Sequence, residues 1–171
     1  FKLTALEAIE DANNDLTLSM RLVIKSNLEE YDFLLKQIKI FEEQLKQVAK
    51  ESPDCQRLIG VPGVGILGAT AFIASIGDAN IFKNGRHVGS FLGLVPKQYS
   101  TGGKARLLSI TKRGDPELRA ILIHGARANL LAIKRKKNIS DGLSKWALDL
   151  LEKKGWGKAS VALANKMAPG A

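Results

Sequence analysis

Apolar side chains recur every three or four positions between residues 16 and 50, and this spacing predicts one long amphipathic helix. The repeating positions are Ile24, Leu28, Tyr31, Leu35, Ile38, Leu45 and Val48. Charged residues fill many of the positions between them, and neither proline nor glycine interrupts the run. We expect a coiled-coil arm that ends at Ser52-Pro53-Asp54; a long core helix of one compact domain is the alternative.

The pattern then changes to an apolar, glycine-containing segment, LIGVPGVGILGATAFIASIG, at residues 58–77. It predicts a helix–hairpin–helix: a short helix over Gln56–Ile59, a turn over Gly60–Gly65 and a second helix over Ile66–Ile76. Gly63 and Gly65 would let the backbone approach a phosphate closely, next to the free N–H groups of the second helix. A tight turn that only packs two helices together has the same pattern.

Weaker signals between residues 78 and 113 predict a connector, a short helix and one small β-hairpin. The dipeptide Asn84-Gly85 indicates a turn. Leu94–Gln98 and Leu107–Ile110 are the two apolar runs that we expect to pair. Between them, Ser100–Gly103 reads as a flexible loop.

The remainder of the chain predicts helices. Asp115 followed by Pro116 is typical of a helix start, and the helix should reach about Lys134. Two more helices are expected over about 141–154 and 158–167, separated at Gly155. The predicted fold class is therefore mainly α: a long N-terminal arm, then a helical domain with a helix–hairpin–helix and one small hairpin.

We expect an arm at 1–52, a domain at 53–168 and a disordered tail at 169–171. The chain begins with Phe1 rather than methionine, so we expect a fragment of a longer protein. No apolar run is long enough to span a bilayer, so no membrane partner is expected. The single cysteine, Cys55, is typical of a reducing cytosol, and we expect a cytoplasmic location.

Charge divides the chain unevenly. Residues 1–55 carry a net charge of −4 and residues 56–171 a net charge of +13. Between Lys97 and Lys137 there are eleven lysines and arginines against two acids. Such a basic region favours nucleic acid as the partner. The candidate nucleic-acid contacts are Gly63, Gly65, Lys104, Arg106, Lys112, Arg113, Arg119 and Arg127.

Three segments together resemble a known family. They are VPGVGILGATAFIASIGD, then FLGLVPKQYSTGGKARLLSITKRGDPELRAILIHGARA, then GWGKASVALANKMA. They are similar to the C-terminal region of the IS110/IS116/IS902-type transposases, over about residues 58–167. The preceding helix resembles the coiled-coil linker of that family.

The resemblance implies DNA recombination between an insertion element and its target. It implies a structured guide (bridge) RNA, homo-oligomerisation through the arm and a bacterial or archaeal host with the protein at the nucleoid. Family members also carry a RuvC-like domain with four metal-binding acidic residues, which is not in this sequence. We expect a divalent metal such as Mg²⁺ there, and no metal or cofactor within this chain.

The family motif places its proposed serine nucleophile at Ser100, within YSTGGK. A serine hydroxyl needs activation, and no histidine or acid lies near it in the sequence, so a composite site completed by the other domain is expected. Neighbouring cations would stabilise charge on the phosphorus, and Gly102 and Gly103 would leave room for it. Thr101 and Tyr99 are weaker candidates, and a hydroxyl that merely caps a turn is the structural alternative.

The other polar and aromatic residues predict structural roles. We expect His87 in an exposed loop, His124 partly buried, and Ser109 and Thr111 bonded to the backbone. Trp146 and Trp156 read as core residues. The alternative to a nucleophile-bearing domain is a non-catalytic module that binds DNA or RNA and oligomerises.

Overall fold

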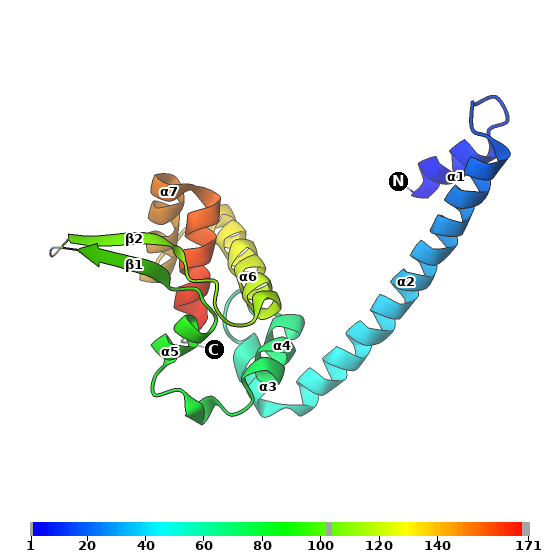
Figure 1. The fold of residues 1–171 in the computed structure, drawn as a ribbon. Helices are drawn as coiled ribbons and strands as arrows, with labels where there is room; N and C mark the ends of the chain where they lie inside the picture. The colour runs from blue at the N-terminus through cyan, green and yellow to red at the C-terminus, as the bar shows by residue number, and fades with distance from the viewer. Residues whose placement is uncertain (1, 102–103, 169–171) are drawn as a thin grey trace. The chain divides into compact units, whose positions relative to one another are not determined.

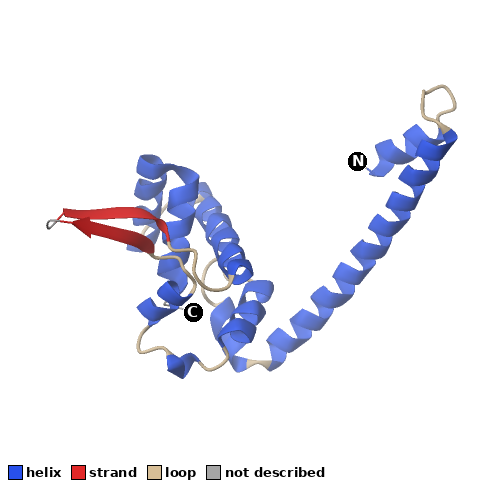
Figure 2. Cartoon of the chain, in the orientation of Figure 1, coloured by secondary structure: helices blue, strands red, loops and turns tan. Residues whose placement is uncertain are grey.

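A computed structural model describes residues 2–101 and 104–168, with the backbone alone at 79, 100–101 and 104–105. By internal contacts the chain divides into two units, residues 1–46 and 47–171. Helices make up most of both units, and the described strands form one two-stranded sheet (Figures 1 and 2). The predicted mainly α fold is confirmed. None of the described helices has the length and apolar character needed to cross a membrane.

The first unit pairs helix α1 (Lys2–Glu10) with the greater part of helix α2 (Leu18–Glu51). Arg21 fastens the turn between them, because its guanidinium donates to the carbonyls of Ala8 and Ile9 in the last turn of α1. It also donates to the side chain of Asn14 at 2.6 Å. A cation at the end of α1 satisfies carbonyls that the helix leaves free. The long predicted helix is confirmed.

In the second unit, helix α3 (Pro53–Ile59) and helix α4 (Ile66–Ile76) are joined by the predicted turn. The expected start of α3 at Gln56 is wrong by three residues. Ser52 is the N-cap, its hydroxyl accepts from the Cys55 N–H, and Pro53 occupies the first turn, where its missing N–H is harmless. Leu58, Val64 and Phe72 are buried in the core that this pair helps to form.

Two long helices complete that core. Helix α6 (Pro116–Arg135) buries a stripe at four-residue spacing, made of Leu118, Leu122, Ala126 and Leu130. Helix α7 (Gly142–Met167) packs along it and contains a break at Gly155, whose φ of 77° is left-handed. The two helices predicted on either side of Gly155 therefore exist as two segments of α7.

The turn between α3 and α4 packs directly on α6. A Cβ at Gly125 would lie 2.0 Å from the Gly63 carbonyl oxygen, and a Cβ at Gly63 would lie 2.7 Å from the Gly125 oxygen. The Asn129 side chain donates to the Pro62 carbonyl at 3.1 Å beside this contact. Glycine at both positions lets the two backbones meet without side chains between them.

Strands β1 (Pro96–Thr101) and β2 (Lys104–Ile110) form an antiparallel hairpin, with a register shift between Pro96 and Gln98. The predicted pairing is confirmed but extends further. Asn84-Gly85 is not a free turn: Asn84 caps helix α5 (Gly85–Phe91), which follows the short 3₁₀ helix η1 (Ala79–Ile81). Figure 1 shows the hairpin extending away from α6 and α7. The tail at 169–171 lies outside the described residues.

Replacing Gly125 by alanine should lower the stability of the second unit. The new methyl group meets the Gly63 carbonyl, so the turn and α6 must separate, at about 1–3 kcal/mol of unfolding free energy. Thermal unfolding followed by circular dichroism measures this. Gly157→Ala is the control, because a Cβ there meets nothing within 4 Å and should leave stability equal or slightly higher. Equal stability for both variants would contradict the proposed close contact.

Candidate nucleic-acid interface

Basic side chains between residues 97 and 137 are available to solvent. Those of Lys97, Arg106, Lys112, Arg113, Arg127, Lys134, Arg135, Lys136 and Lys137 are exposed. Among the described side chains, none of these cations forms an ion pair with a carboxylate. Unneutralised positive charge at a surface attracts polyanions.

The hairpin carries the nucleophile candidate. Ser100 stands in strand β1 opposite Ala105, and Tyr99 stands opposite Arg106. The prediction of a flexible loop at Ser100 and Thr101 is therefore wrong, because both residues are hydrogen-bonded into the sheet. Apolar and polar residues do not alternate in this segment, so its sequence provided no signal for a strand. The side chains of Ser100, Thr101 and Lys104 lie outside the described part, as do Gly102 and Gly103.

The base of the hairpin is built from close backbone contacts. A Cβ at Gly93 would lie 2.2 Å from the Arg113 oxygen, and one at Gly114 would lie 2.0 Å from the Phe91 oxygen. Between these contacts Lys112 adopts a left-handed φ of 57°, and its N–H donates to the Gly93 carbonyl at 3.0 Å. The strained turn presents the exposed Lys112 and Arg113 beside the strands.

Arg119 has a different environment from the other candidate cations. Its guanidinium donates to the carbonyls of Leu92 at 3.2 Å and Arg113 at 3.0 Å, so it ties both sides of the hairpin base to α6. Arg127, two turns further along the same helix, is exposed. Both arginines are predicted as nucleic-acid contacts, but Arg119 is engaged with backbone carbonyls.

Asp115 fixes the start of α6. Its carboxylate accepts from the Ser75 hydroxyl at 2.7 Å and from the N–H groups of Glu117 and Leu118. These bonds, the Ser75 hydroxyl first, lower the pKa of Asp115, and the charge of Arg119 adds to the effect. The predicted N-cap is thus also a bridge from α6 to α4.

The two glycines of the α3–α4 turn differ. Gly63 faces α6 and Met167, so packing accounts for it without a ligand. Gly65 is exposed, is the N-cap of α4, and has no atom within 4 Å of where its Cβ would be. Of the two, only Gly65 leaves space for a phosphate, and such a contact stays a prediction.

Comparison with known proteins shows which protein family has this domain. The family model described as Transposase IS116/IS110/IS902 family matches residues 55–140, about half of the chain. The chain belongs to this family. The matched span runs from α3 through the hairpin to the end of α6, so it contains the turn, the Ser100 strand and the Arg119 contacts.

Individual members of the IS116/IS110/IS902 family are similar over a longer stretch. The transposase for insertion sequence element IS1111A of Coxiella burnetii is 50% identical over 129 residues, 75% of this chain. A probable family 20 transposase of Pseudomonas aeruginosa is 43% identical over 140 residues, and the transposase for IS1328 of Yersinia enterocolitica is 36% identical over 140, each over 82% of this chain. The chain spans 35–41% of the length of these curated relatives.

Several smaller predictions are tested in this family domain. His124, on α6, is exposed rather than partly buried. The Thr111 hydroxyl is buried and has no hydrogen-bond partner among the described residues, so its expected backbone bond is wrong. His87 is exposed as expected, but on α5. Trp146 and Trp156 are half-buried and pack against the core.

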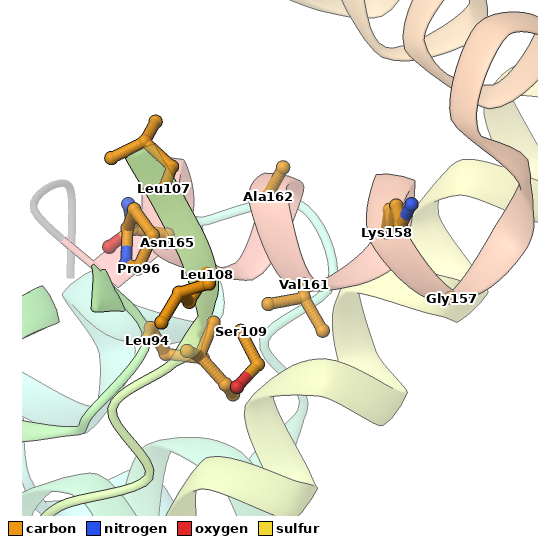
Figure 3. Close-up of a pocket in the computed structure, with 11 residues that line it drawn as sticks. Leu94, Pro96, Leu107, Leu108, Ser109, Gly157, Lys158, Val161, Ala162 and Asn165 are labelled. Carbon is orange, nitrogen blue, oxygen red and sulfur yellow. The ribbon is translucent and has the colours of Figure 1, made fainter. Parts of the chain in front are cut away.

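A hollow of about 730 Å³ lies between strand β2 and helix α7. Figure 3 shows its aliphatic lining, with Leu107 and Leu108 on the strand and Val161 and Ala162 on the helix. Lys158 is the only charged side chain among its described lining residues. Within the described chain no group of three or more histidine, cysteine or acidic residues could hold a metal ion.

Replacing Asp115 by asparagine should lower stability at neutral pH, because the charged carboxylate is the form that its three hydrogen-bond donors favour. A carboxyl whose pKa is lowered on folding stabilises the fold above its ordinary pKa of 3.8, and this contribution is lost as the pH falls through the folded value. The stability difference between the native chain and Asp115→Asn should therefore shrink below about pH 4. Urea unfolding at pH 7 and pH 3 measures it; a constant difference would contradict the assignment.

Proposed function

We propose that this chain is the part of an insertion-element transposase that binds nucleic acid and supplies a serine nucleophile. Family membership and the names of the relatives support the transposase assignment. The observation that carries nucleic-acid binding is the set of exposed, unpaired cations between Lys97 and Lys137. The guide RNA of the family is proposed as a further partner on the same grounds of charge.

The serine step needs groups beyond those described. In the proposed reaction Ser100 Oγ loses its proton and forms a bond to a DNA phosphorus, while the bond from phosphorus to one sugar oxygen breaks and that oxygen takes up a proton. Arg106, which is paired with Tyr99 next to Ser100, would offset the added negative charge, whereas Lys112 and Arg113 lie at the hairpin base, away from Ser100.

The proposed reaction also needs a general base to take the proton from the Ser100 hydroxyl. Residues 88–114 contain no histidine, aspartate or glutamate. The described acids likewise offer no place for the divalent metal that the family implies. We therefore propose that a RuvC-like domain supplies both, and that Ser100 is half of a composite site.

Ser100→Ala in the complete transposase tests the nucleophile. We expect the covalent protein–DNA adduct to disappear and strand exchange to fall by about a thousandfold or more. Ser109→Ala is the matched control, because Ser109 lies in the opposite strand of the same hairpin and should behave like the native protein. Denaturing gels of end-labelled DNA detect the adduct. A normal adduct with Ser100→Ala would favour the non-catalytic module, and loss with Thr101→Ala alone would move the role to Thr101.

We also propose that the arm joins copies of the protein. Along α2, Tyr31, Leu35, Ile38 and Val48 belong to the predicted apolar repeat and are exposed. An apolar repeat of this spacing without cover in one chain is suited to pairing with another helix.

Replacing both Leu35 and Ile38 by lysine should dissociate the oligomer. Sedimentation equilibrium of the chain should then give the monomer mass of 18.6 kDa. Phe33→Lys is the control, because Phe33 is equally exposed but lies off the repeat, so the oligomer should persist. A native chain that is already monomeric at about 100 µM, roughly the concentration at which weak assemblies form, would overturn this proposal.

A further inference from the structure

A second hollow lies between α6 and α7, away from the hairpin strands. Its lining consists of His124, Arg127, Ala128 and Leu131 on α6 and Trp156 on α7, and its volume is about 420 Å³. Trp156 directly follows the break at Gly155, where α7 changes direction. One aromatic ring thus shares the hollow with the guanidinium of Arg127 and the imidazole of His124.

Trp156 is anchored but not covered. Part of the indole packs against the core, and the residue remains half-buried at the hollow. The Lys134 ammonium lies 5.6 Å from the centre of the ring. A lysine at this distance on an exposed surface interacts weakly with the ring, and its long stem moves easily.

The charged side chains that follow the first turn of α6 have one sign. From Leu118 to Arg135, α6 contains no acidic residue, and its four charged side chains are Arg119, Arg127, Lys134 and Arg135. Arg127 and Lys134 are exposed, and neither forms an ion pair with a described carboxylate. An aromatic ring flanked by free cations matches a flat base with phosphates on both sides.

We propose that this hollow binds one unpaired base of a single-stranded nucleic acid, stacked on Trp156. Arg127 and Lys134 contact the flanking phosphates, and the Lys134 ammonium leaves the ring when the base arrives, because base stacking is stronger than an exposed cation–ring contact. Duplex offers no free base face, so it does not use this hollow. The inference rests on the proposed nucleic-acid binding and adds a site for unpaired strand to it.

The fluorescence of Trp156 reports the stack without altering it. In a Trp146→Phe background Trp156 is the single tryptophan of the chain. Titration with a ten-nucleotide oligothymidylate, an oligouridylate of equal length and a duplex should quench the fluorescence with the single strands and leave it nearly unchanged with the duplex. Quenching by one single strand alone identifies DNA or RNA as the source of the base. Binding of both strands without quenching would overturn the proposal.

Affinity gives the second test. Trp156→Leu keeps an apolar side chain against the core and removes the stacking surface, so single-strand affinity should fall by about fivefold to a hundredfold, with duplex affinity unchanged. Trp146→Leu is the matched control, since Trp146 is also half-buried on α7 with Lys166 4.7 Å from its ring but does not line the hollow. Circular dichroism confirms that both variants fold.

The outcomes separate this inference from the proposed function. Native affinity that falls steeply with salt, together with equal affinities for Trp156→Leu and the native chain, would overturn the stacking site and leave the basic surface standing. Absence of binding to any of the three nucleic acids would overturn both.

Discussion

The arrangement of the second unit depends on places where two backbones touch with no side chain between them. At Gly63 and Gly125 the α3–α4 turn sits against α6, and at Gly93 and Gly114 the two ends of the hairpin cross. A packed interior deforms little, so these contacts fix where the hairpin emerges from the helices. Arg119 then secures the crossing by donating to carbonyls on both sides.

These contacts distinguish residues that pack within the fold from residues that remain free to bind a ligand, although both kinds look alike in the sequence. Gly63 and Gly65 belong to one turn, but α6 fills the space beside Gly63, whereas the space beside Gly65 is open. Arg119 and Arg127 belong to one helix, but the first holds the backbone and the second faces solvent. Because nucleic acid can only contact what the fold leaves free, the candidate interface is smaller than the list of basic residues and glycines.

Much of the fold could be predicted because local signals dominate it. The repeat along α2, the Asp115-Pro116 helix start and the break at Gly155 each act within a few residues. The remainder depends on contacts distant in sequence. The exposure of His124 and the strand conformation of Ser100 follow from how α6 and the hairpin pack, which no local pattern encodes. The candidate nucleophile came from family resemblance, and the hollow at Trp156 needed two helices to be placed side by side.

The register shift between Pro96 and Gln98 has a consequence for how this hairpin can change over evolutionary time. An irregularity of this kind interrupts the alternation of a strand, so pairing beyond it is set separately from pairing before it. Insertions or deletions at the outer end need not propagate to the crossing at Gly93 and Gly114. Related elements can therefore vary the length and reach of the outer end while inheriting an unchanged attachment to the helices.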